Sequence, residues 1–328
     1  MTSQASFETK DLLDKAFRVV QNREGYKMKF ILKPKPPYDF TLHLKFFSFD
    51  KPLPEVYENG VWKRALRLES KKLVPLKVRM LGDVEDPRLE VSVFDRINEK
   101  ERLEIKNKLS WIFSTEEDLT ELYSFMDKDP VLEKVKRRLY GLRPFKCSTV
   151  FEGIIKSIIQ QQISLIGSMY ITSRLIERFG DKVQIEKEEF YEFPSPNSLS
   201  GARIEELKRC GLSRQKAEYI KQFSEIVVNN EFNPENLKEL SSEEIIEILT
   251  RFKGIGRWTA ELVIVTSTGK DALPADDLGA RRAVSRFYFG KKLLSGDELR
   301  EFAKRWGKFR GIITYYLICA DRLKLKSG

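Results

Sequence analysis

Apolar and polar residues alternate with a period of two through much of residues 38–94, and with a helical period through most of the chain after residue 109. The alternating runs are DFTLHLKFF (39–47), VWKRALRLE (61–69), LVPLKVRML (73–81) and LEVSVFD (89–95). Alternation of this kind places apolar side chains on one face of a strand, so we expect these runs to form an antiparallel sheet. A charged amphipathic stretch from Phe7 to Asn22 predicts a helix ahead of the sheet.

The second part of the chain is punctuated by the breaks DP, GLRP and FPSPNSLSG between helical segments. We therefore predict an α+β protein that is mainly α. Its N-terminal antiparallel sheet domain, with the leading helix, would occupy residues 1–108, and an all-helical part would occupy residues 109–328.

An excess of basic residues favours a polyanionic partner. The 328 residues include 59 Lys and Arg against 49 Asp and Glu, a net charge of +10. This balance is typical of proteins that bind nucleic acid or an anionic membrane surface. No apolar run approaches the roughly 18 residues of a membrane span, and the N-terminus lacks a secretory pattern. We expect no membrane association, and a location in the cytoplasm with the nucleoid of a prokaryote or in the nucleus of a eukaryote.

Cysteine and histidine are scarce. The three cysteines, Cys147, Cys210 and Cys319, are widely spaced, which excludes a disulfide framework and a four-cysteine zinc or iron-sulfur site. The single histidine, His43, argues against a Ser-His-Asp triad and against a histidine-rich metal centre. It lies in a strand-like run on the face opposite Phe40, so we expect a solvated or hydrogen-bonded surface residue.

Residues 251–261, RFKGIGRWTAE, place two glycines between two predicted helices. The first helix begins near Ser242, after a capping-box pattern formed by Ser241 and Glu244, and the second begins at about Arg257.

Gly254 and Gly256 can adopt positive φ and let main-chain N–H groups approach an anion closely. Ile255 can pack between the helices, and Lys253 adds a positive charge. The pattern predicts a backbone clamp for phosphate, and a plain helix–helix turn that uses two glycines is the alternative.

A second block, DALPADDLGARRAV (271–284), combines a proline break, two adjacent carboxylates and a basic helix. An apolar, strand-like LVIVTST (262–268) precedes it, and FEGIIKSIIQQQIS (151–164) predicts a helix and turn upstream. In this order and spacing, the blocks resemble the helix-hairpin-helix DNA glycosylase superfamily, and within it 3-methyladenine DNA glycosylase II, the AlkA type. The resemblance extends from about residue 37 to about residue 322, and implies a sheet domain followed by two helical subdomains with the active-site cleft between them.

The resemblance implies one catalytic carboxylate. Counting from the family's aspartate to an arginine five positions later selects Asp277 and Arg282, and Asp276 then becomes the helix N-cap. Asp276 is the alternative catalytic residue, because a one-residue slip reverses the two roles. The carboxylate is expected to stabilise the cation that develops on the sugar as an alkylated base departs.

The resemblance also implies a base pocket and an intercalating wedge. The expected pocket residues are Trp258, Leu262 and Gln161. The wedge falls within residues 160–162 and is assigned to Gln162, where relatives often carry leucine. Trp258 stands where members that also cleave the DNA backbone carry a lysine, which predicts hydrolysis without backbone cleavage.

We thus predict a monofunctional DNA glycosylase that flips alkylated bases of the 3-methyladenine class out of double-stranded DNA in base excision repair. The protein is expected to be a monomer without a cofactor, apart from a Na⁺ or K⁺ ion that the resemblance allows at hairpin carbonyls near Phe252 and Ile255. A glycosylase of the same fold for oxidised or deaminated bases, or a non-catalytic DNA-binding protein, are the alternatives. The expected DNA-binding residues are Gln162, Lys253, Gly254, Ile255, Gly256, Arg257, Thr259 and Arg282.

Overall fold

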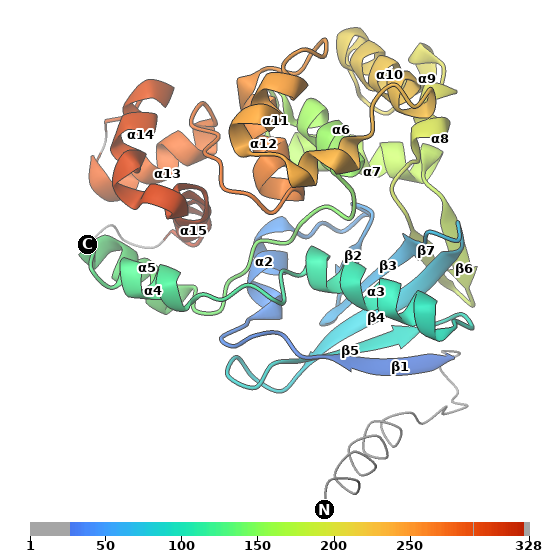
Figure 1. The fold of residues 1–328 in the computed structure, drawn as a ribbon, viewed down its shortest axis with the longest axis horizontal. Coiled ribbons are helices and arrows are strands. Elements are labelled where there is room, and N and C mark those ends of the chain that lie inside the picture. The colour runs from blue at the N-terminus through green and yellow to red at the C-terminus, as the bar shows by residue number, and fades with distance from the viewer. Residues whose placement is uncertain (1–26, 291, 325–328) are drawn as a thin grey trace, which may run out of the picture.

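A five-stranded antiparallel sheet forms the N-terminal part of the protein (Figure 1). The computed structural model describes residues 27–290 and 292–324, so the helix predicted between Phe7 and Asn22 lies outside the described residues. The strand order is β1-β5-β4-β3-β2. The strands are β1 (Met28–Leu32), β2 (Val56–Glu58), β3 (Val61–Arg67), β4 (Leu73–Leu81) and β5 (Arg88–Val93). Three of the four alternating runs therefore form strands as predicted.

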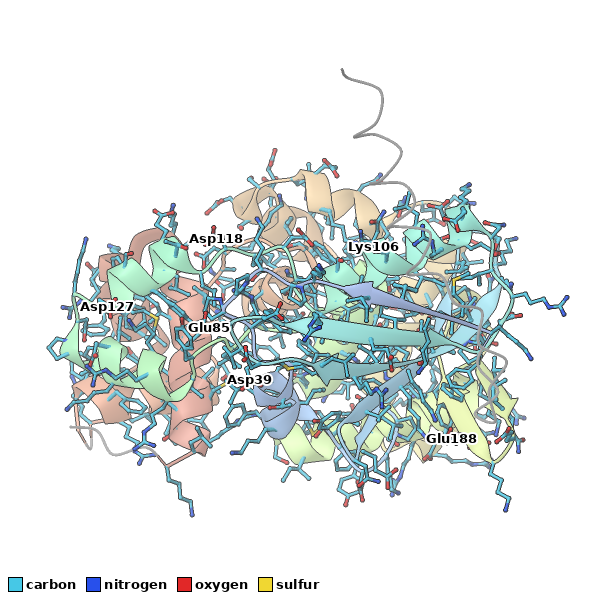
Figure 2. The ribbon with its side chains drawn as sticks, turned by 90° about the horizontal axis from the view of Figure 1, so that it is seen from below. Asp39, Glu85, Lys106, Asp118, Asp127 and Glu188 are labelled. Carbon is cyan, nitrogen blue, oxygen red and sulfur yellow. The ribbon has the colours of Figure 1, made fainter. Side chains whose placement is uncertain are left out.

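The fourth run, DFTLHLKFF, is a helix, α2 (Phe40–Phe47), and the strand prediction for it is wrong. Asp39, labelled in Figure 2, is the N-cap and accepts hydrogen bonds from the N–H groups of Thr41 and Leu42 at 2.8 and 3.2 Å. Phe40 and Leu44, one helical turn apart, are both buried. A short apolar run is compatible with the period of a strand and with that of a helix. Here the Asp39 cap and the burial of Phe40 and Leu44 favour the helix.

His43 is half-buried in an aromatic cluster, so it is hydrogen-bonded as predicted but is less exposed than a solvated surface residue. Its ring stacks on Phe145 and Phe47, with centroids 4.4 and 4.8 Å away. The main-chain N–H of Phe145 donates to Nδ1 at 3.2 Å, and the Tyr315 hydroxyl lies 2.8 Å from the same atom. Burial, together with the positive charges of Arg322 and Lys156, lowers the pKa of His43 to about 3.

The helices form two groups, each with its own core, above and beside the sheet (Figure 1). The first group comprises α6 (Val150–Gln160), α7 (Leu165–Phe179), α8 (Pro196–Ser200), α9 (Ile204–Arg209), α10 (Arg214–Val228), η1 (Pro234–Glu239), α11 (Ser242–Leu249) and α12 (Arg257–Ser267). The second comprises α4 (Thr120–Met126), α5 (Pro130–Arg138), α13 (Leu278–Tyr288), α14 (Gly296–Ala303), η2 (Lys304–Phe309) and α15 (Arg310–Arg322). The mainly α fold class is confirmed. No helix of the described residues is both long and apolar enough to cross a membrane.

Two elements cross the predicted division between sheet and helices. Helix α3 (Glu99–Ile112) contains the predicted boundary at residue 108, and its Ile105 and Leu109 are part of the sheet's core. A hairpin of β6 (Lys182–Ile185) and β7 (Glu188–Tyr191) interrupts the part expected to be all-helical. Glu188, labelled in Figure 2, forms an ion pair with Lys77 of β4, which attaches the hairpin to the sheet.

A buried ionic cluster joins the sheet to α6. The Arg64 guanidinium of β3 contacts Glu152 of α6 at 2.9 Å and Glu192 at 2.5 Å, and all three residues are buried. Lys156, one turn after Glu152, pairs with it at 2.6 Å. Burial disfavours the charge of Glu152, but Arg64 and Lys156 outweigh that effect and lower its pKa to about 2. The cluster fixes the orientation of α6 against the sheet.

We expect His43 to stay neutral in the folded protein between pH 8 and pH 5. Its folded pKa lies below the value of about 6.5 of an unfolded histidine. The stability that depends on neutral His43 is therefore complete above that pH and is lost as the pH falls toward 3, because the unfolded chain takes up the proton first. NMR of the imidazole ring measures this directly, since the chain has a single histidine.

The same resonance in urea-unfolded protein is the control and should titrate near the ordinary value. A midpoint near pH 6 in the folded protein would contradict the buried environment described above.

Candidate active site

The loop between α11 and α12 forms a tight hairpin, as the sequence predicts. Ser241 and Glu244 form the capping box of α11, and Ile255 is buried between the two helices. Gly254 has φ +86°, and a Cβ atom there would lie 2.0 Å from the Tyr219 ring. Gly256 has φ −92°, so the prediction of positive φ is wrong at this position. No described atom lies within 4 Å of a Cβ placed on Gly256, and the protein itself therefore does not require glycine there.

The N-terminus of α12 has no side-chain cap. Gly256 is its N-cap residue, and no side chain of residues 27–290 or 292–324 accepts a hydrogen bond from the first turn. The positive end of the helix dipole and unsatisfied N–H groups favour an anion at such an end. Lys253 and Arg257 are exposed beside it. Thr259 is buried and its Oγ1 atom accepts a hydrogen bond from Gln161, so its side chain is not free for the contact predicted for it.

The turn after α6 carries Gln162 to the surface. Gln162 is exposed and has φ +54°, a conformation that non-glycine residues rarely adopt. Lys216 of α10 donates to the carbonyls of Ile159 and Gln161 at 2.8 and 2.5 Å and so caps the end of α6.

Gln161 connects this turn to the hairpin. Its Nε2 atom donates to the Gly254 carbonyl at 2.7 Å and contacts Thr259 Oγ1 at 3.0 Å. Gln161 stays a predicted pocket residue, and its amide nitrogen is bound to the hairpin. The turn and the hairpin are linked through one side chain.

Trp258 and Leu262 lie one turn apart on α12, and both are half-buried. The indole Nε1 of Trp258 is enclosed and has no hydrogen-bond partner among residues 27–290 and 292–324. A buried donor without a partner is costly, so the packing around this indole is retained at an energetic cost. The strand-like prediction for LVIVTST is wrong, since these residues continue α12 up to Ser267. Val263 and Ile264 of this run are buried.

The two neighbouring aspartates have different environments. Asp277 is the N-cap of α13 and accepts a hydrogen bond from the Ala280 N–H at 2.9 Å. It forms no ion pair with any residue that the structure describes. Asp276 is exposed and pairs with Arg300 of α14 at 2.8 Å. The prediction that Asp276 caps the helix is therefore wrong, because α13 begins at Leu278 and the residue before it is Asp277.

Arg322, at the end of α15, was not among the predicted residues and lies where its charge is affected by that of Asp277. Its guanidinium lies 4.4 Å from the centroid of the Phe47 ring, and it donates to the Phe46 carbonyl at 3.0 Å. Burial lowers the pKa of Arg322, and the charge of Asp277 is one of those that oppose this shift. Tyr315 and Arg322 are seven residues apart, which indicates that they share one face of a helix. The local sequence does not predict that this face packs beside α2.

Arg282 lies on α13 one turn beyond Asp277. Its side chain is 63% exposed and contacts Asp321 at 3.3 Å. It lines a shallow hollow of about 290 Å³ together with Leu278, Ser285, Arg286, Gly290 and Leu293. The exposed guanidinium is therefore available to an anion beside the N-terminus of α13.

Comparison with known proteins gives consistent results. The family model of the HhH-GPD superfamily base excision DNA repair protein matches residues 155–308. A solved structure described as 3-methyladenine DNA-glycosylase from Archaeoglobus fulgidus is 40% identical, with a TM-score of 0.81 over 90% of this chain and 99% of that chain. DNA-3-methyladenine glycosylase 1 of Schizosaccharomyces pombe is 31% identical over 53% of this chain and 73% of its own length.

An 8-oxoguanine glycosylase/lyase from Clostridium acetobutylicum, solved with double-stranded DNA, shares the fold. Its TM-score is 0.68 at 21% identity, over 92% of this chain and 99% of that chain.

We expect alanine at the two hairpin glycines to have different effects on stability. Gly254→Ala should lower the free energy of unfolding by about 1–3 kcal/mol, because it strains a positive-φ position and displaces Tyr219. Gly256→Ala should change it by less than about 0.5 kcal/mol, since its backbone is extended and its surroundings are open. Urea unfolding of the three proteins provides the measurement. Equal losses in both variants would show that the hairpin geometry is described wrongly.

Proposed function

Since the chain belongs to the HhH-GPD superfamily and is a base excision repair DNA glycosylase, we propose that it excises alkylated bases of the 3-methyladenine class from double-stranded DNA. The bond broken is the N-glycosidic bond, water is the nucleophile, and the DNA backbone stays intact. The observation that carries this proposal is the environment of Asp277, a carboxylate that caps α13 and has no ion-pair partner among the described residues.

The proposed role of Asp277 is electrostatic. An alkylated purine already carries positive charge, so the base departs readily and the cation left on the sugar is the difficulty. The N-terminus of α13 and the N–H of Ala280 stabilise the negative charge of Asp277. A fixed anion close to the sugar then lowers the energy of the cationic transition state and orients the attacking water.

The reacting bond is inaccessible inside a duplex, so the damaged nucleotide must turn out of the stack. We assign the wedge that fills the gap to Gln162, which is exposed on a turn held by Lys216 and Gln161. The uncapped end of α12 would bind phosphate through its N–H groups. Lys253, Arg257 and Arg282 would add positive charge along the strand.

The base pocket is assigned to the face of α12 that carries Trp258 and Leu262. An indole attracts a cationic base by roughly 0.5 to 2 kcal/mol. The half-buried state of both side chains supports this assignment, because each keeps part of its surface open to a ligand. Trp258 also replaces the amine that a Schiff-base mechanism requires, which supports hydrolysis.

The carbonyls of Phe252 and Ile255 would hold a Na⁺ or K⁺ ion at the hairpin. Main-chain oxygens suit a hard cation, and the hydrogen bond of 3.1 Å from the Ile255 N–H to the Phe252 carbonyl keeps this turn tight. Such an ion would stabilise the hairpin and take no part in the chemistry.

We expect Asp277→Asn to reduce excision by about a hundredfold to a thousandfold, because the negative charge is removed. Asparagine is itself a good helix N-cap, so α13 should remain folded. The measurement is single-turnover release of 3-methyladenine or hypoxanthine from a labelled duplex, with binding to a duplex that contains an abasic-site analogue as the control. An undiminished excision rate in the variant would exclude Asp277 as the catalytic group.

Borohydride trapping tests the class of mechanism. We expect the wild-type protein to leave an abasic site that breaks only after treatment with alkali, and to form no covalent adduct with DNA. This follows from Trp258, which offers no nucleophilic nitrogen at the position of the lysine. An adduct retained on a denaturing gel after reduction would place the protein among the glycosylase/lyases.

A further inference from the structure

One guanidinium links three parts of the candidate site. Arg300 of α14 contacts Glu261 of α12 through Oε1 at 2.5 Å and Oε2 at 3.2 Å. The same side chain donates to the carbonyl of Leu273 at 3.3 Å and to Oδ2 of Asp276 at 2.8 Å. Leu273 and Asp276 both belong to the segment that connects α12 to α13 and ends at Asp277. Arg300 therefore attaches this segment to the helix that carries Trp258.

Glu261 makes the attachment strong. Its side chain is 3% exposed, and Arg257 donates to its Oε1 atom at 3.0 Å. A buried carboxylate needs charged or hydrogen-bonding partners, because it has lost its hydration. Arg300 supplies a planar group with several donors, which can bind Glu261, a carbonyl and Asp276 at once.

Asp276 is held from a second side by α14. A Cβ atom on Gly296, at the first turn of α14, would lie 2.0 Å from Asp276 Oδ1, so the carboxylate occupies the space that this glycine leaves. The exposed position of Asp276 alone would make its ion pair weak. The close packing against Gly296 and the buried Glu261 beyond Arg300 give the contact a fixed geometry.

We propose that Arg300 is a positioning residue, which acts through Asp276 and the Leu273 carbonyl to hold Asp277 in a fixed position relative to α12. The proposal rests on the proposed function. Asp276 is bound to Arg300, whereas the only hydrogen bond of the Asp277 side chain among the described residues is the one that caps α13. The position of Asp277 matters because a displacement of about 1 Å at a reacting centre can cost on the order of a hundredfold in rate.

The test compares Arg300→Gln, Asp276→Asn and the double variant. We expect each single variant to lower the single-turnover excision rate at saturating enzyme about 10- to 100-fold, and affinity for an abasic-analogue duplex to change less than about threefold. The double variant should be no slower than the slower single variant, since both remove the same link. Arg300→Lys should recover part of the rate, because an ammonium group can reach some of the same acceptors.

Glu301→Gln is the matched control on the same helix. Glu301 pairs with Lys304 at the surface, and both side chains are more than two-thirds exposed, at 72% and 70%. This variant should keep the wild-type rate. Amide exchange at Ala280, whose N–H binds Asp277, gives a readout that is independent of activity. Exchange should accelerate in Arg300→Gln and Asp276→Asn, and should not change in Glu301→Gln.

Unchanged rates together with unchanged Ala280 exchange would overturn the proposal. Additive losses, or a loss of duplex affinity as large as the loss of rate, would also overturn it, because Arg300 would then act on the fold as a whole. The assay uses whichever damaged-base duplex the wild-type protein cleaves. A wild-type protein that ignores 3-methyladenine would refute the proposed substrate class, while the amide exchange would still decide the role of Arg300.

Discussion

The close packing of α6 against α12 is the constraint on which the candidate site depends. Gly153 makes it possible, because a Cβ atom there would lie 2.4 Å from Ser267 Oγ on α12. At the opposite end of the two helices, Gln161 binds the Gly254 carbonyl. The turn that ends α6 and the hairpin that begins α12 are thereby held at a fixed separation. In the proposed function, the wedge and the phosphate clamp would need this separation in order to act on neighbouring nucleotides.

Two arginines, each paired with a buried glutamate, connect this helix pair to the rest of the molecule. Arg64 joins α6 to the sheet through Glu152, and Arg300 joins α12 to the connection with α13 through Glu261. Buried ion pairs gain little net stability, because desolvation offsets most of their attraction, but a broken pair is costly. Their main effect is to give one relative arrangement of distant segments a much lower free energy than the alternative arrangements. The sheet, which contributes no catalytic carboxylate in the proposed function, thus serves to orient α6.

The N-termini of α12 and α13 differ in how their first N–H groups are satisfied. Each helix begins with N–H groups that lack intrahelical partners. Helix α12 begins at Gly256 without a side-chain cap, whereas Asp277 caps α13. In the proposed function, the open end is available to a DNA phosphate and the capped end presents a carboxylate to the sugar. In that proposal, two short loops with different N-cap residues would provide binding and catalysis.

The sequence by itself determined the features that depend on neighbours along the chain. These are the strands of residues 61–95, the capping box of α11, and the hairpin that follows it. Tertiary structure decided whether residues 39–47 formed a strand or a helix, because that short apolar run fits both until its core is known. It also decided that Gln161 binds the hairpin and that Arg300 holds Asp276, since these partners lie 93 and 24 positions away. Periodicity and capping are short-range properties, whereas the burial and pairing of a charge depend on segments that only the fold brings together.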